Sequence, residues 1–461
     1  MAKVRLCSFV VSVELVYVLQ AAASYLHLVR IPIESGDQLR FTGIVQVGSP
    51  PRSVRVVFDT GSSDTWVTSN HFAANADDAP SLKAFTIGYG SGIVSGLTAP
   101  AYLQIGGQLE SNTNGVLVRD IPVGFVDDQV SMMTELDAQG VVGLGMEALA
   151  QIRSNLCLLR LIAEQQVVSR PVVFSVYISS WTGAQPPSQL ILGGDDPALT
   201  NSYTTWFTFP VISNDELRGH RTPVSDVAIT KNSFGFWVLR MQSMYFDNEI
   251  LPLGPASHQG AVLLDSGTSV LLLPQYAFDA VVQALMTRFG IRFLAPRGRH
   301  QTLPACRRCQ VHEFPPLSLD LLLEDGTKSE TSSQRFVLQG SDYVRCDQQR
   351  RECTALIDSF QSSEVSDRFL VVVLGTVFLR SYYTRFDYSN KQVALACTVD
   401  ERGVCPGGFK PALDHRGQPY QPYSEALQVN RYLTALCIAI TALALLIGLR
   451  LLLESYEKRV V

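Results

Sequence analysis

Two segments of the chain each place an aspartate directly after an apolar run. Val56-Val57-Phe58 precedes Asp59-Thr60-Gly61-Ser62-Ser63, and Val262-Leu263-Leu264 precedes Asp265-Ser266-Gly267-Thr268-Ser269. Apolar, β-branched runs of this kind predict buried strands that end in turns. A carboxylate at the end of a buried strand is costly unless it is hydrogen-bonded, shared or used in chemistry. One such turn is common, but two matched copies indicate two similar lobes that each offer one aspartate to a shared cleft.

Two carboxylates within hydrogen-bond reach do not both ionise easily, so such a pair holds one proton between its members. The ionised member can take a proton from water, while the protonated member polarises a carbonyl oxygen. This chemistry hydrolyses an amide by general acid–base catalysis, and it requires no covalent intermediate, metal ion or cofactor. We therefore expect no metal site and no cofactor.

Other hydrolytic chemistries lack their characteristic motifs. The sequence contains no His-Glu-x-x-His and no Gly-x-Ser-x-Gly elbow. A glycosidase also uses two carboxylates, but its chemistry does not require two matched small-residue turns. Amide hydrolysis is therefore favoured over glycoside hydrolysis.

The duplication extends beyond the aspartates. An apolar pair ending in glycine follows each of them, with Gly143 lying 84 residues after Asp59 and Gly375 lying 110 residues after Asp265. Alternate glycines from Phe85 to Gly96 predict a β-hairpin with Tyr89 near its tip. Helices are predicted over Met146–Gln165 and Gln275–Phe289, and closing strands over Phe378–Asp387 and Val393–Cys397.

Length and composition restrict the class of protein. A chain of 461 residues can bury large cores, and strands rich in valine, leucine and aromatic residues between glycines and prolines predict a mostly β fold. The formal net charge of −5 provides no basic footprint, so a nucleic-acid partner is not expected.

Both ends of the chain contain apolar runs. Residues 1–23 have the pattern of a signal peptide, because Lys3 and Arg5 precede an apolar stretch and three small residues, 21–23. An uncleaved amphipathic start is the alternative. Residues 431–453 are long and apolar enough for one transmembrane helix, and a buried core helix is the alternative. The basic residues of the tail, 454–461, place that tail in the cytosol.

Six cysteines of the C-terminal half are candidates for disulfides: Cys306, Cys309, Cys346, Cys353, Cys397 and Cys405. An oxidising compartment favours three bridges, for which fifteen pairings are possible, and Cys157 would be left over. Cys306-x-x-Cys309 together with Cys346 and Cys353 also fits a zinc knuckle, which we consider the less favoured alternative in a secreted chain.

From about Phe41 to Cys397 the sequence resembles the pepsin-like aspartic proteases. The resemblance is carried by the two aspartate segments and by Phe378–Asp387, which is similar to the closing strands of that family. It implies a bilobal β fold with two lobes related by a pseudo-two-fold axis and a cleft between them. The expected organisation is a signal peptide at 1–23, an N-terminal lobe at 24–199, a C-terminal lobe at 200–398, a stalk at 399–430, the membrane helix and the tail.

The resemblance also implies roles for individual residues. Asp59 and Asp265 would be the catalytic pair. The supporting residues would be Thr60, Ser62, Ser266, Thr268 and Trp66. The substrate-binding residues would be Gly61, Tyr89, Gly90, Ser91, Gly267 and Ser269, with Tyr89 on a flap over the cleft. One departure is Thr376, which stands where the family often carries aspartate.

These features predict a membrane-anchored aspartic endopeptidase that cleaves peptides or proteins of the secretory pathway or cell surface. The expected form is a monomeric, single-pass type I protein whose catalytic part is lumenal, endosomal or extracellular. A second hypothesis is a catalytically silent pepsin-like protein used for binding. Such a protein would typically lose an aspartate, a supporting hydroxyl or the flap tyrosine, and none of these is missing here.

Overall fold

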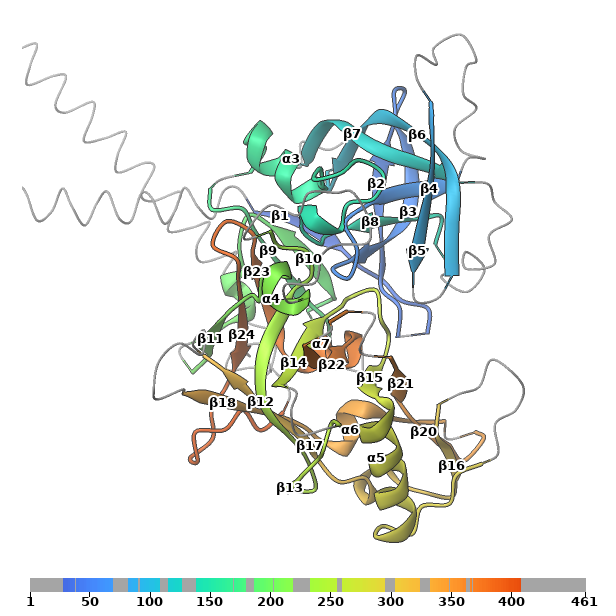
Figure 1. Cartoon of the computed structure of the whole chain (residues 1–461), viewed down its shortest axis with the longest axis vertical. Coiled ribbons are helices and arrows are strands. Elements are labelled where there is room, and N and C mark those ends of the chain that lie inside the picture. Colours follow the sequence, from blue (N-terminus) through green and yellow to red (C-terminus); the bar gives the residue numbers. More distant parts are fainter. Residues whose placement is uncertain are drawn as a thin grey trace, which may run out of the picture. The chain divides into compact units, whose positions relative to one another are not determined.

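The computed structural model describes residues 28–407 apart from 38, 69–81, 90–91, 108–114, 127–137, 169, 180–185, 202, 219–232, 255–258, 295–302, 324–331, 348, 362–364 and 367. Strands dominate these residues, and the predicted mostly β class is confirmed (Figure 1). The predicted signal peptide and transmembrane segment lie outside the described residues. Among the residues that are described, no helix has the length and apolar character needed to cross a membrane.

The N-terminal half forms a seven-stranded sheet in the order β2-β3-β8-β4-β7-β6-β5. Its strands are β2 (Thr42–Val47), β3 (Arg52–Asp59), β4 (Thr65–Thr68), β5 (Lys83–Tyr89), β6 (Gly92–Ile105), β7 (Val116–Val126) and β8 (Gly140–Gly143). The predicted hairpin is present, because β5 and β6 pair antiparallel from Lys83↔Thr98 to Tyr89↔Gly92.

The C-terminal half forms an eight-stranded sheet in the order β18-β17-β12-β14-β22-β15-β21, with β13 paired to β12. Its strands are β12 (Val238–Phe246), β13 (Glu249–Ile250), β14 (Gln259–Leu264), β15 (Leu271–Pro274), β17 (Leu317–Leu322), β18 (Ser333–Leu338), β21 (Ile357–Phe360) and β22 (Phe369–Leu374).

The two sheets repeat one pattern of pairing. In the first, β3 runs parallel to β8, β8 antiparallel to β4, and β4 parallel to β7. In the second, β14 runs parallel to β22, β22 antiparallel to β15, and β15 parallel to β21. The duplication predicted from the aspartate and glycine spacings is therefore a duplication of sheet topology.

The aspartate strands are apolar at successive positions because both of their faces are buried. Phe58 of β3 and Leu264 of β14 belong to the large core. Val57 packs instead into a smaller cluster with Trp66 and Phe85, and Leu263 into another smaller cluster. Each strand therefore has a fixed position between two packed layers.

A six-stranded sheet combines strands from both halves in the order β1-β10-β9-β23-β24-β11. Its strands are β1 (Val29–Pro32), β9 (Val173–Tyr177), β10 (Gln189–Leu192), β11 (Thr205–Pro210), β23 (Tyr383–Asp387) and β24 (Gln392–Cys397). Because β23 pairs with β9, the chain returns from its C-terminal half to a strand laid down much earlier.

A three-stranded sheet has the order β16-β20-β19, with β16 (Ala305–Arg307), β19 (Val344–Asp347) and β20 (Glu352–Ala355). The disulfides are Cys306–Cys309, Cys346–Cys353 and Cys397–Cys405. The prediction of three bridges is confirmed, and Cys157 is buried and unpaired. The zinc-knuckle alternative is wrong for this structure, because its four cysteines are paired with one another and are not free thiolates.

The helical segments are η3 (Glu147–Leu149), α3 (Leu158–Gln165), η4 (Pro197–Leu199), α4 (Asn214–Arg218), α5 (Gln275–Thr287), η5 (Val311–Glu313), α6 (Gly340–Tyr343) and α7 (Thr376–Ser381). The helix predicted over Gln275–Phe289 is confirmed as α5. A continuous helix over Met146–Gln165 is wrong. The Asp64 carboxylate accepts the backbone N–H groups of Gln151 and Ile152, which withdraws them from helical hydrogen bonding.

The closing strand predicted over Phe378–Asp387 is wrong in its first part. Thr376–Ser381 form α7, all of whose residues are buried, and β23 begins only at Tyr383. A short apolar run buried on every side has no periodicity that distinguishes strand from helix. The second predicted closing strand, Val393–Cys397, is confirmed within β24.

Candidate active site

The two aspartates lie at equivalent ends of equivalent strands. Asp59 is the last residue of β3, and Asp265 directly follows β14. Asp59 pairs with Gly143 of β8, and the backbone N–H of Asp265 donates to Leu374 O of β22 at 3.1 Å. A Cβ on Gly143 or Gly375 would collide with main-chain atoms of the neighbouring aspartate turn. Glycine is therefore needed for the strand behind each turn to approach it closely.

The residues after the aspartates interlock the two turns. Thr60 Oγ1 donates to Leu264 O at 2.9 Å and accepts the Ser266 N–H at 2.9 Å. Reciprocally, Ser266 Oγ donates to Phe58 O at 2.7 Å and accepts the Thr60 N–H at 3.0 Å. Each hydroxyl thus bonds to main chain on both sides of the opposite aspartate, which fixes the separation of the turns.

Each carboxylate is held by a matching pair of donors. The Gly61 N–H donates to Asp59 Oδ1 at 2.8 Å, and the Ser62 hydroxyl donates to Asp59 Oδ2. The Gly267 N–H donates to Asp265 Oδ1 at 2.8 Å, and the Thr268 hydroxyl donates to Asp265 Oδ2 at 2.6 Å. Because these donors stabilise the charged form, they favour ionisation of one member of the pair.

The two carboxyl groups are close enough to interact directly. Burial raises the pKa of Asp59, and the negative charge of Asp265 and a hydrogen bond between the two side chains raise it further. A Cβ placed on Gly61 would lie 2.7 Å from Asp265 Cγ, and one on Gly267 would collide with Asp59 Oδ1. The glycines therefore leave the space in which the carboxyl groups meet.

Trp66 and Tyr89 link the hairpin to this site. Trp66 is fully buried, and its indole Nε1–H donates to the Tyr89 hydroxyl oxygen at 2.7 Å. Burial, with a further contribution from the Asp59 charge, raises the pKa of Tyr89, while hydrogen bonds from Trp66 and Ser62 oppose that rise. Tyr89 thus remains protonated near Asp59. Gly90 and Ser91, predicted to bind substrate, lie outside the described residues.

The turn after Asp265 has an additional hydrogen-bonding partner. Thr376, at the start of α7, is buried, and its hydroxyl lies 3.0 Å from Ser269 O and 2.8 Å from Leu39 O. Its backbone N–H donates to Thr268 O at 2.8 Å. In the sequence, Thr376 is conspicuous only because the family often carries aspartate at this position. Its contacts are seen only in the structure. Ser269, predicted to bind substrate, is therefore engaged through its carbonyl with Thr376.

The arrangement is suited to general acid–base chemistry. Two carboxyl groups interact directly, each has its own donors, and the hydroxyl of Tyr89 lies beside one of them. Such a pair can hold one proton, with one member acting as base and the other as acid. The fold and the site together define the class of aspartic proteases.

Comparison with known proteins gives the family. Residues 40–398 match the family described as eukaryotic aspartyl protease. Gastricsin of Cavia porcellus is 26% identical over 373 residues, covering 77% of this chain and 79% of the relative. Pepsin A of Sus scrofa is 24% identical over 383 residues, covering 79% and 83%. Renin-2 of Mus musculus is 24% identical over 375 residues, covering 77% and 79%. The chain belongs to the eukaryotic aspartyl protease family, and it is an aspartic endopeptidase.

Proposed function

We propose that Asp59 and Asp265 are the catalytic pair of this endopeptidase. The single observation that carries the proposal is the direct interaction of the two carboxyl groups, each held by a glycine N–H and a hydroxyl. The raised pKa of Asp59 supports its assignment as the member that keeps the shared proton. Asp265, the other member of the pair, is then the base.

In the proposed reaction, a water molecule bound between the carboxyl groups attacks the scissile carbonyl carbon. Asp265 takes a proton from the water as the new C–O bond forms, and Asp59 donates its proton to the carbonyl oxygen. Asp265 then donates its proton to the leaving nitrogen as the C–N bond breaks, while one hydroxyl of the tetrahedral diol returns its proton to Asp59 and the carbonyl re-forms. Two products leave, a carboxylic acid and an amine, and the pair again holds one proton.

The substrate is proposed to bind as an extended strand across Gly61 and Gly267. Both glycine N–H groups already face the carboxylates, so the substrate backbone would meet the turns through their exposed edges. Tyr89, Gly90, Ser91 and Ser269 are proposed to contact the same peptide. The position of Tyr89 beside Asp59 supports a role for the β5–β6 hairpin in covering the bound peptide.

We propose further that residues 431–453 anchor the enzyme in a membrane with its catalytic part in the lumen or outside the cell, where it cleaves secretory-pathway or surface proteins. The apolar, uncharged character of 432–449 and the basic residues Lys458 and Arg459 of the tail support this topology. A chain ending at 430 should then be released into the medium, whereas the full chain should remain in the membrane fraction. Equal release of both forms would contradict the anchor.

The test of the catalytic pair is peptide cleavage by the wild type and by Asp59→Ala. Cleavage should fall by about 10³-fold, within the range of general acid–base contributions. Unchanged cleavage by the variant would contradict the proposal. A wild type that folds but cleaves no peptide from a broad library would favour the catalytically silent alternative.

A further inference from the structure

The three-stranded sheet β16-β20-β19 carries two pairs of adjacent arginines. Arg307-Arg308 lies at the end of β16, and Arg350-Arg351 lies in the turn between β19 and β20. Residues 305–309 and 344–355 contain five arginines and two acidic residues, although the whole chain has a net charge of −5. We call Arg307, Arg308, Arg350 and Arg351 the arginine turns.

The arginine turns are held together by main-chain bonds. The Arg308 N–H donates to Arg351 O at 3.1 Å, and Arg307 pairs with Glu352 between β16 and β20. The disulfides Cys306–Cys309 and Cys346–Cys353 close the two loops that contain the arginines. The four side chains therefore start from a rigid platform that spans two distant parts of the sequence (Figure 1).

Both turns place an arginine in the left-handed backbone region. The φ angle is 61° at Arg308 and 50° at Arg351. This conformation is uncommon for residues other than glycine, asparagine and aspartate, and it costs about 1 kcal/mol or more for other residues. Glycine would adopt this backbone conformation without that cost, so the fold alone does not require arginine at either position.

The charges of the arginine turns are weakly neutralised within the described part of the chain. All four residues are exposed. Arg307 lies 3.7 Å from Glu352 and Arg350 lies 3.5 Å from Asp347, with arginine side chains 57% and 77% exposed. Pairs of this kind contribute little to stability, because water and salt screen them. Arg308 and Arg351 make no ion pair with another described residue, so their guanidinium groups are available to an anionic partner.

A chain of contacts leads from this sheet to the catalytic turn. Arg345 of β19 donates to Asp37 O, and Leu39 O lies 2.8 Å from the Thr376 hydroxyl. That hydroxyl also contacts Ser269 O in the turn that begins at Asp265. An extended peptide covers about 3.3 Å per residue, so a flank of about ten residues would extend roughly 30 Å from the cleaved bond. A protein substrate is therefore long enough to occupy the cleft and to extend over the surface beyond it.

We propose that the arginine turns bind an acidic segment that flanks the cleavage site in protein substrates. Guanidinium groups hold carboxylates through two parallel hydrogen bonds, and paired arginines on a rigid platform match the repeated carboxylates of an acidic peptide. The inference rests on the proposed function, because it assigns the surface to a substrate of that site. It adds a second point of recognition outside the cleft.

The test compares a short peptide substrate with the same peptide carrying a ten-residue glutamate-rich extension at either end. The wild type should cleave one of the extended peptides with a kcat/KM about fivefold to tenfold higher, through a lower KM, as expected for several exposed ion pairs. In Arg308→Gln/Arg351→Gln this advantage should disappear, while the short peptide is cleaved as before. Salt at about 0.5 M should also remove the advantage, because it screens exposed charges.

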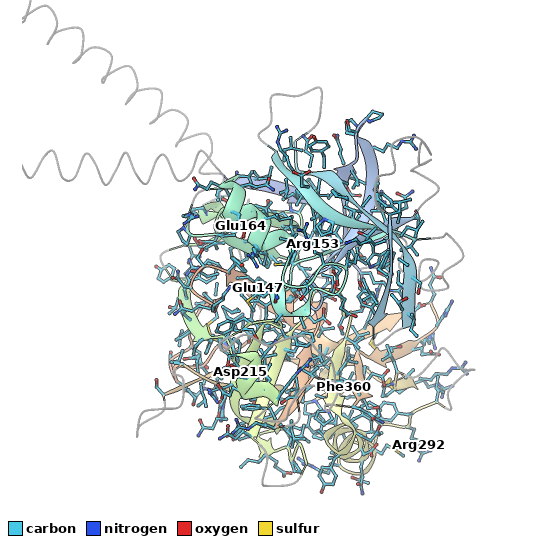
Figure 2. All side chains as sticks on the ribbon, turned by 45° about the horizontal axis from the view of Figure 1, so that its top comes forward. Glu147, Arg153, Glu164, Asp215, Arg292 and Phe360 are labelled. Atoms are coloured by element: carbon cyan, nitrogen blue, oxygen red, sulfur yellow. A yellow bond between two sulfur atoms is a disulfide. The ribbon has the colours of Figure 1, made fainter. Side chains whose placement is uncertain are left out.

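The matched control is Arg153→Gln/Arg170→Gln, which removes the same charge from exposed arginines of the N-terminal half. Arg292 marks the position of the three-stranded sheet, because the next residue, Phe293, forms a β-bridge with Cys306 of β16. Arg153 lies well apart from Arg292 (Figure 2). The control should retain the full advantage of the extended peptide. Its loss in both double variants would show a general effect of charge and would overturn the proposal.

Two further results would overturn the proposal. One is an equal kcat/KM for short and extended peptides in the wild type. The other is binding of a sulfated polysaccharide to the arginine turns without any gain for acidic peptides. If the wild type cleaves neither peptide, the proposed function fails separately, and calorimetric titration of the acidic peptide still tests this surface. Tighter binding to the wild type than to Arg308→Gln/Arg351→Gln would support it, and equal binding would contradict it.

Discussion

The two aspartate turns have the same hydrogen bonds but different surroundings. In both, a glycine N–H and a hydroxyl hold the carboxylate, and a hydroxyl from the opposite turn supports the main chain. Asp59 is buried and lies beside Tyr89, whereas Asp265 is half-buried and its turn is supported by Thr376. The residue after Gly143 is Leu144, whose carbonyl accepts the Trp237 indole N–H at 2.9 Å.

In the proposed mechanism the two matched turns have different roles, and the difference in their surroundings accounts for this. The shared bonds position both carboxylates, while burial and neighbouring charge decide which of them keeps a proton. Since burial is the largest cause of the raised pKa of Asp59, the environment rather than the motif separates acid from base in the proposed mechanism. Substitution of a residue that makes the hydrogen bonds common to both turns should therefore affect both turns alike. Substitution of a residue that surrounds only one turn should affect that turn alone.

The largest effect is expected where the turns meet. Gly61→Ala would place a methyl group 2.7 Å from Asp265 Cγ, and Gly267→Ala would press on Asp59. Both should lower kcat/KM by about 10²-fold, since displacements of about 1 Å have effects of this size. Gly88→Ala is the control, because a Cβ there meets nothing within 4 Å. A glycine variant with full activity would contradict the close approach of the carboxyl groups.

A smaller and symmetrical effect is expected from the interlocking hydroxyls. Thr60→Val and Ser266→Ala each remove two hydrogen bonds, so each should lower the free energy of unfolding by about 2 kcal/mol. Chemical denaturation of both variants measures this directly. A loss confined to one of them would show that the two turns are not equivalent supports.

The smallest effect is expected from Thr376, which supports only the turn that follows Asp265. Thr376→Val keeps the shape of the side chain but removes the hydroxyl between Ser269 O and Leu39 O, at a cost of about 1 kcal/mol. We expect kcat to fall a few-fold while the Trp66–Tyr89 contact is unaffected, because that contact belongs to the other turn. Thr376→Ser, which retains the hydroxyl, should restore activity. Failure of serine to do so would assign the effect to packing.

The close approach of the two aspartate turns was predicted from the sequence because its signals are local. An apolar run, an aspartate and a small-residue turn lie within eight residues of one another, and the motif occurs twice. Two secondary-structure predictions were wrong because tertiary contacts determine the structure of those segments. Asp64 interrupts the helix predicted over Met146–Gln165, and complete burial hides the helical character of Thr376–Ser381.

Contacts between distant segments could not be predicted. Six cysteines allow fifteen pairings, and the sequence contains nothing that selects the three observed. The approach of Arg308 to Arg351 depends on the pairing of β16 with β20, which are separated by three other strands in the chain. The left-handed conformation of both arginines likewise follows from the loops that enclose them.

The pH dependence of kcat/KM for a short peptide tests the central claim most directly, because it reports the protons held by Asp59 and Asp265 in the free enzyme. Asp59 has a raised pKa, so it should carry the shared proton at acidic pH and lose it as the pH increases. Activity should therefore hold while Asp59 keeps its proton and fall as the pH rises through the pKa of Asp59, which is raised to about 8. A rate that stays constant from neutral to alkaline pH would contradict a pair that works with one proton.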